Sequence, residues 1–445
     1  MDVPPIQITQ APPLNAGAAP FLAKAPPFWL PMRHFVAAAF SFWLFAAALV
    51  WGNSRLLGFS FDARWALGLT HLLTLGWVTM TIMGALIQLM VVVHGVPFAA
   101  PGRLAWAWAL LTAGTAGFVG GLWAGWDRYW IAAALVFAGV LIYLQVFVES
   151  LIQGGKLDWT GRHVAVALAY LSLVILLGLL LAYDRERGIL FHDPRGVLIE
   201  HIHLALVGWV SLMIVGASYR LVAMFSLSHI ESKAPGLVAL VLANVGLLGL
   251  ALDSLLGSRR LLSAWACVLA AAYAAYAFQM NGIFRGRLRR IDPALAYTLL
   301  ALLGGAVWAA LGLGLAFGLV KDGAPQEIAY VLAALLGWAT PFILGQIHKI
   351  VPFLVWLHVF SPKNWRPPLQ IPRTQDLASE KAAWWEMGFL AAAAYSLIGG
   401  FLLESPALIR LGSWSLLVCA TLYAGNTALT LSFLKRPWTP SKPRP

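Results

Sequence analysis

The sequence predicts an all-α polytopic membrane protein with twelve transmembrane helices. Of its 445 residues, 60% are hydrophobic and only 11% are charged, whereas soluble domains carry about 25% charged residues. Long apolar runs recur from residue 28 to residue 434, far more than a secretory signal accounts for. Because open sheets cannot span lipid and these runs are too long for barrel strands, we expect the spans to be helices.

The expected spans form one membrane domain over residues 28–434. Several exceed the roughly 20 residues that cross a bilayer, so we expect some to tilt or protrude. The Pro- and Ala-rich segment 1–27 and the ending 435–445 are predicted to be disordered tails, and 357–384 to be the longest internal loop. The twelve spans lie near 28–51, 64–93, 104–124, 130–151, 163–183, 197–225, 235–256, 260–283, 293–318, 326–356, 385–405 and 409–434.

The distribution of Lys and Arg predicts the orientation. With the amino terminus inside, the inner segments hold most of these residues, including the cluster at Arg285, Arg287, Arg289 and Arg290. This asymmetry indicates a bacterial-type inner membrane protein with both termini in the cytoplasm. The same rule explains the net charge of +12, and no nucleic-acid-binding motif occurs. Both cysteines fall inside spans, so no disulfide framework is implied.

An internal repeat indicates the architecture. The stretch HLLTLGWVTMTIMGALIQ at 71–88 matches HLALVGWVSLMIVGASYR at 203–220, with an offset of 132 residues. A fainter copy, LLGWATPFILGQIHK at 335–349, follows the second at an offset of 129. The second, sixth and tenth spans are therefore equivalent, and the repeating unit is four helices. We expect three units, near 28–151, 163–283 and 293–434, around a pseudo-threefold axis.

A polar position recurs four residues after the last Gly of each copy. It is occupied by Gln88, Arg220 and Lys349, which share one helix face with the repeated Trp and Gly. Intramembrane Arg and Lys are costly and usually face the bundle interior or water. Two interpretations remain open: a polar layer that snorkels toward the inner headgroups, or a site for an anion, a propionate or a proton.

Histidines at matching repeat positions are the candidate ligands. His71 and His203 lie at the same depth near the outer end of central helices, and neutral imidazoles commonly bind iron, copper or zinc. His201 lies nearly opposite His203 on its helix, and His348 is a further candidate cofactor ligand on the tenth span. The bland alternative is that each is only hydrogen-bonded. We expect the other inner histidines, His34, His94, His163, His229 and His358, to lie at the membrane interface.

These features resemble a known superfamily. Twelve spans in three four-helix units, with His on the second and sixth, are similar to cytochrome c oxidase subunit I, and hence to the haem-copper oxidases and nitric oxide reductases. The phrase HIHLALVGWVSLMIVGASYRL at 201–221 also resembles short bacterial oxidase subunit I-like proteins. A weaker likeness is to twelve-span haem- and copper-containing proteins associated with the nitric oxide response. In motif, the resemblance covers only the second, sixth and, faintly, tenth spans.

The resemblance implies only part of the family's ligand set. It suggests His71 as a ligand of low-spin haem and His203 or His201 as a copper ligand. The family's His pair on the seventh span is missing from PGLVALVLANVGLLGLALDSLL, and its His-x-His on the tenth span is replaced by His348 followed by Lys349. The residue level with His71 on the tenth span is Leu332, about 24 Å from His348 along the helix. These departures question oxygen or nitric oxide reduction by the family's mechanism, so an enzymatic activity is left open.

Three classes of function follow. The first is a haem-associated redox or gas-related protein with cytochrome c or another redox partner. In it, His71 and His203 clamp one haem b or each bind something separate, or copper binds at His71, His201 and His203. The second is a transporter of a small anion or solute, lined by Gln88, Arg220 and Lys349, although no Gly- or Pro-interrupted short spans recur in matched positions. The third is a non-catalytic oxidase assembly factor. Signatures of soluble enzymes, such as phosphate loops and HExxH, are missing from the sequence.

Overall fold

Apolar helices build the protein. We describe a computed structural model at residues 26–53, 56–58, 63–94, 98, 100–154, 157–230, 232–255, 260–360 and 372–435. Twelve helices in this part are long and apolar enough to cross a membrane, which confirms the predicted all-helical, multi-pass class. The expected tails lie almost wholly outside the described residues, as does the middle of the expected loop 357–384. The carboxyl-terminal part of this expected loop is instead helical: Thr374–Leu377 forms a short 3-10 helix, and the next span begins at Glu380.

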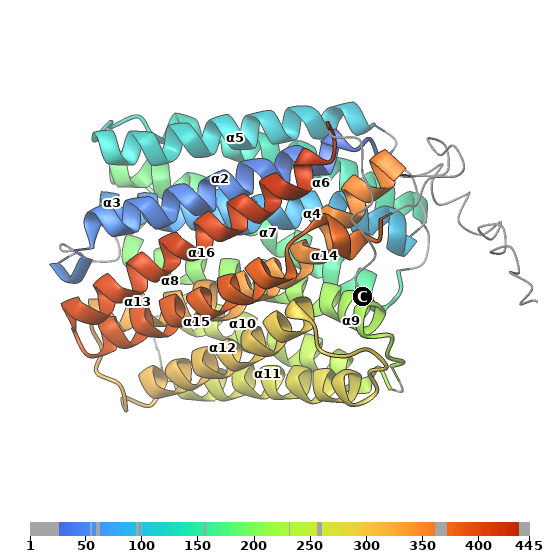
Figure 1. Ribbon diagram of the computed structural model, residues 1–445. Helices are drawn as coiled ribbons and strands as arrows, with labels where there is room; N and C mark the ends of the chain where they lie inside the picture. Colours follow the sequence, from blue (N-terminus) through green and yellow to red (C-terminus); the bar gives the residue numbers. More distant parts are fainter. Residues whose placement is uncertain are drawn as a thin grey trace, which may run out of the picture.

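The spans run side by side along a common direction (Figure 1). The labels α3, α8 and α13 lie toward one end of the bundle, and α4, α9 and α14 toward the other. Three spans are composite, with a π-helical segment in the middle. In order, the spans are α2 (Trp29–Gly52), α3–η2–α4 (Arg64–His71, Leu72–Thr79, Met80–His94), α5 (Pro101–Ala124), α6 (Trp130–Gly154), α7 (Trp159–Arg187), α8–η3–α9 (Pro194–His203, Leu204–Ser211, Leu212–Ser226), α10 (Ala234–Leu255), α11 (Leu262–Arg285), α12 (Pro293–Ala316), α13–η4–α14 (Ala324–Leu332, Ala333–Ala339, Thr340–Phe360), α15 (Glu380–Leu402) and α16 (Pro406–Ser432).

The three composite spans, the second, sixth and tenth, carry the sequence repeat and lie inside the bundle. The most apolar windows of the second and tenth are 83% and 78% buried, the highest fractions among the twelve. Consecutive spans pack on one another, and α2 also packs on α16, so the first span lies against the last. Each π-helical segment begins directly after His71, His203 or Leu332. Such segments are rare and often occur at functional sites, and the sequence pattern did not reveal them.

Hydrogen bonds link the three inner spans in a closed cycle. Each span contributes a Trp indole as donor and, two residues later, a hydroxyl as acceptor. Because each indole reaches the neighbouring span rather than its own, the repeat positions hold the three helices together. The bonds run from Trp77 to Thr340 (3.2 Å), from Trp338 to Ser211 (3.0 Å) and from Trp209 to Thr79 (3.1 Å).

The repeat also extends to the helices that precede the inner spans. A Cβ added at Gly84 would meet His34 Cβ at 2.7 Å, and one at Gly216 would meet His163 Cβ at 2.5 Å. At Gly345 the corresponding neighbour is Tyr297 Cβ, at 2.7 Å. The helix that precedes each inner span therefore packs on the repeated glycine, through His34, His163 or Tyr297. The two histidines are fully buried within the protein, and their expected depth at the membrane interface stays a prediction.

Candidate functional site

His203 lines a large cavity, which we call cavity A. It is the last residue of α8, and its Nδ1 donates to the carbonyl oxygen of Ile199, one turn earlier, at 2.8 Å. This bond fixes the ring and leaves Nε2 as the nitrogen available to a ligand. Cavity A has a volume of about 610 Å³ and lies among the sixth to tenth spans.

The walls of cavity A are mainly apolar and aromatic. The His203 and Tyr330 ring centroids are 6.0 Å apart, and Tyr330 lies 5.8 Å from Trp308. Charged groups also line it: a guanidinium nitrogen of Arg195 lies 2.9 Å from a carboxylate oxygen of Glu327. The cavity thus combines one oriented imidazole, flat aromatic walls and an ion pair, and its volume lies within the roughly 300–1,000 Å³ of small-molecule and cofactor sites.

His71 lies in a different cavity, cavity B, together with His201. Cavity B has a volume of about 200 Å³ and is lined by both rings, whose centroids are 6.5 Å apart with 23° between their planes. The Nδ1 of His71 donates to the carbonyl oxygen of Leu67 at 2.8 Å, as His203 does to Ile199. The matching repeat positions therefore share their backbone bond but line separate cavities, and the expected pairing of His71 with His203 is replaced by His71 with His201.

The three outer histidines do not form one cluster. His201 and His203 lie on opposite sides of their helix, as their spacing predicts, so they line cavities B and A respectively. Within the described ranges, no group of three or more His, Cys, Asp or Glu side chains is placed to hold a metal ion. The predicted copper set of His71, His201 and His203 is thus divided, and only its first two members face each other.

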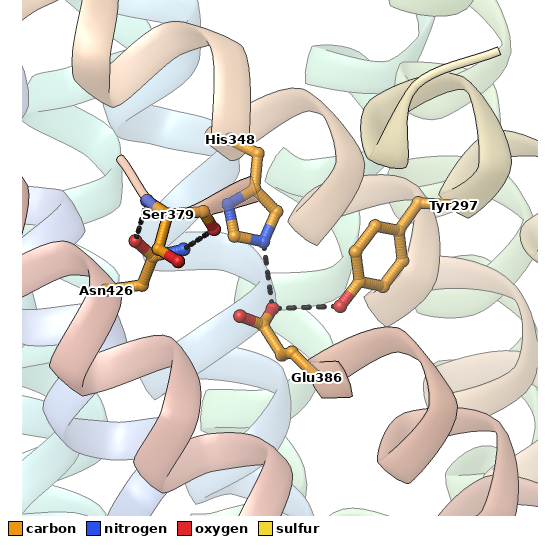
Figure 2. Close-up of polar contacts among 5 residues, drawn as sticks. All are labelled: Tyr297, His348, Ser379, Glu386 and Asn426. Carbon is orange, nitrogen blue, oxygen red and sulfur yellow. Dashed lines mark hydrogen bonds and ion pairs between the residues drawn. The ribbon is translucent and has the colours of Figure 1, made fainter. Parts of the chain in front are cut away.

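His348 takes part in a buried network at the opposite end of the bundle. Its Nε2 lies 3.0 Å from Oε1 of Glu386, which also accepts a 2.9 Å hydrogen bond from the Tyr297 hydroxyl (Figure 2). The Glu386 side chain is fully buried, while that of His348 is 11% exposed. His348 also lines a third cavity, cavity C, of about 550 Å³. The sequence pattern did not single out Glu386, although an acid inside an apolar span is a recognised signal.

The expected polar layer is only partly formed. Gln88 is buried and lines cavity C, where Lys349 also lies and pairs with Asp292 at 2.5 Å. Arg220 is exposed and does not line cavity C. The prediction of an interior ring of Gln88, Arg220 and Lys349 is therefore wrong for Arg220, because the face of α9 that carries this residue turns away from cavity C.

Comparisons with known proteins give no assignment. No protein-family model matches the chain, and no curated protein sequence matches it. The chemistry of the three cavities is therefore the basis for a functional proposal.

Proposed function

We propose that the protein is a haem-associated membrane protein with an electron-transfer or gas-binding role, and that haem b binds in cavity A with His203 as an axial ligand. One observation carries this proposal: a single imidazole, oriented by a backbone carbonyl, lines an apolar cavity of about 610 Å³. Backbone bonds of this kind fix the tautomer of ligating histidines and raise their basicity.

The residues of cavity A suit such a group. Tyr330 and Trp308 supply flat aromatic surfaces. The Arg195 guanidinium can bind a haem carboxylate if it exchanges its partner Glu327. The acids Glu200, Asp253 and Asp322 also line the cavity. When bound, haem supplies one-electron transfer or the binding of small gases such as oxygen and nitric oxide, according to its axial ligands and pocket. The chain's own part is to hold the iron through His203 and to surround the ring with mainly apolar side chains.

A subunit I-like arrangement is part of the same proposal. The closed cycle of indole–hydroxyl bonds supports three equivalent units around the inner spans. Cavity A is lined by one imidazole rather than the family's larger set, because the seventh span, which also lines it, carries no His. This favours a single-haem protein over an oxygen or nitric oxide reductase. The inner membrane, the cytoplasmic termini and a redox partner such as cytochrome c stay predictions.

Copper is proposed for cavity B. Two imidazoles that bind one ion through bonds of about 2.0–2.1 Å have ring centroids roughly 6 Å apart. The His71 and His201 centroids are 6.5 Å apart, which is close to this value. Imidazole suits copper, and cavity B, at about 200 Å³, has a third of the volume of cavity A.

Removing the His203 imidazole is expected to remove the haem. The full chain is purified in detergent from haem-replete cells, and haem is measured by reduced-minus-oxidised spectra and the pyridine haemochrome assay. His203→Ala should lower the haem content by at least about tenfold, since loss of second-shell support alone costs 10–100-fold in metal affinity. His71→Ala should retain the haem and lower only the copper content, measured on the same sample.

The exposed histidine His192 provides the matched control, because it lies at the same end of the bundle without lining cavity A. His192→Ala should keep wild-type haem content. A colourless wild-type protein would overturn the haem proposal and favour the transport or assembly alternatives. Haem retained by His203→Ala and lost by His71→Ala would move the site to cavity B.

A further inference from the structure

Glu386 is an acid held away from solvent in the membrane domain. Among the described residues it is the acidic side chain with no exposed surface at all. It lies in the second turn of α15, whose start is fixed by two hydrogen bonds between Ser379 and Asn426 of α16, at 2.8 and 3.1 Å (Figure 2). Burying an ionised carboxylate is costly unless it is paired and hydrogen-bonded, so its partners decide what the site does.

Two side chains contact the same oxygen of Glu386. The Tyr297 hydroxyl and the His348 ring both reach Oε1, while Oε2 is buried and has no hydrogen-bond partner among the described residues. Imidazole is cationic only when protonated. One proton shared by the pair gives either carboxylate with imidazolium or carboxylic acid with imidazole, and both forms are neutral. A second proton makes carboxylic acid with imidazolium, with one positive charge.

Of the pair, only His348 borders cavity C. His348 lines the cavity and is slightly exposed, whereas Glu386 lies behind it. On the far side, the Tyr423 ring packs edge-on against His348, with centroids 6.3 Å apart, and against Trp77, at 5.5 Å. His348 is thus the member of the Tyr297–Glu386–His348 network that lines cavity C.

The repeat provides an internal comparison. In the first two units the position of Tyr297 is taken by His34 and His163, and each donates its Nδ1 to a backbone carbonyl oxygen four residues earlier, at 2.8 Å. Those two units pack their helices equally closely without a carboxylate partner at that position among the described residues. Packing alone thus does not require the Tyr297–Glu386–His348 network, and its presence in one unit indicates a role beyond support.

From this geometry we propose that Glu386 and His348 form a proton-binding site, loaded and unloaded through cavity C. His348 exchanges protons with the cavity, and Glu386 stores the proton out of contact with solvent. The site is independent of the haem proposal. The titratable and charged groups around the pair and along cavity C are Tyr297 on α12, Cys419 and Tyr423 on α16, the Lys349–Asp292 ion pair, Arg289 and Glu380.

Infrared difference spectroscopy tests the site on the full chain in lipid nanodiscs. The difference between acidic and alkaline buffer should contain a carboxylic acid C=O band that Glu386→Gln removes and Glu386→Asp displaces. Tyr297→Phe should shift this band without removing it, because it deletes one hydrogen bond to Oε1. Tyr143→Phe is the matched control: this buried hydroxyl donates to the Met83 carbonyl oxygen at 2.9 Å, and its loss should leave the band in place.

Exchange into deuterated buffer tests the route. The band should shift soon after mixing in the wild type and much more slowly in His348→Phe, which removes the exchanging imidazole. A wild-type spectrum without a pH-dependent carboxyl band, or one that persists unchanged in Glu386→Gln, would overturn the proton-binding site. If Glu386→Gln does not fold, the wild-type deuterium shift and the Tyr297→Phe displacement decide the question, and a band in the wild type that is unmoved by both refutes the assignment.

Discussion

Gly304→Ala is expected to prevent the ninth and tenth spans from packing. A Cβ at Gly304 would lie 1.8 Å from the Gly337 carbonyl oxygen and 2.1 Å from its carbonyl carbon. Both atoms belong to the backbone, so no rotamer change relieves the overlap and the two helices have to separate. Overpacking usually costs about 1–3 kcal/mol, and we expect at least the upper part of this range, measured by SDS-induced unfolding and by the yield of monodisperse protein.

The two glycines of this contact should respond unequally. A Cβ at Gly337 would come no closer than 3.5 Å to Gly304, which is ordinary contact, so Gly337→Ala should be tolerated. Gly120→Ala on α5 is the matched control, because its added Cβ meets nothing within 4 Å and alanine favours a helix by roughly 0.5–1 kcal/mol. Equal loss of folded protein from Gly304→Ala and Gly120→Ala would refute the close helix crossing.

Trp77→Ala is expected to destabilise the protein by about 3–5 kcal/mol, the usual cost of truncating a buried aromatic side chain to alanine. The Trp77 ring has no exposed surface, stacks on Phe42 at 4.7 Å and donates to the Thr340 hydroxyl. Its removal leaves a cavity between the second, first and twelfth spans and opens the cycle of indole–hydroxyl bonds. Circular dichroism during SDS titration measures the loss.

Trp77→Phe separates the hydrogen bond from the packing. It keeps most of the ring but leaves the buried Thr340 hydroxyl without its donor, for which we expect about 1–3 kcal/mol. Trp51→Ala is the control, because that indole is 78% exposed and its loss should fall within about 0.5 kcal/mol. If Trp77→Phe matched the wild type while Trp77→Ala unfolded, the packing alone would be essential and the bond dispensable.

The sequence predicted the fold class and most span limits because membrane spans depend on local composition. Apolar length is a property of each segment, so the expected 293–318 and the observed Pro293–Ala316 nearly coincide. The repeat likewise aligned Trp77, Trp209 and Trp338, whose indoles form the three indole–hydroxyl bonds between the inner spans. The π-helical turns were not predictable, because widening a helix by one residue leaves no periodic signal in a segment that is apolar on every face.

The candidate sites were predicted less well. Spacing placed His201 and His203 on opposite helix sides, which the separate cavities confirm. It did not reveal that His71 faces His201 rather than its repeat partner, since that depends on how the second and sixth spans are rotated. The sequence did not indicate a role for Glu386 because this residue lies at the expected start of its span, where acidic residues are common. The helix in fact begins at Glu380, so Glu386 lies within it.

By itself, the sequence determined that the chain is a bundle of apolar helices and that three of its spans carry a repeated motif, since segment length, hydrophobicity and repeat period can be read directly from the residues. The tertiary structure decided which imidazoles share a cavity, that Arg220 faces outward, and that Tyr297, His348 and Glu386 meet. Those outcomes depend on helix rotation and crossing, which are fixed by contacts such as Gly304 against Gly337 between segments far apart in the chain.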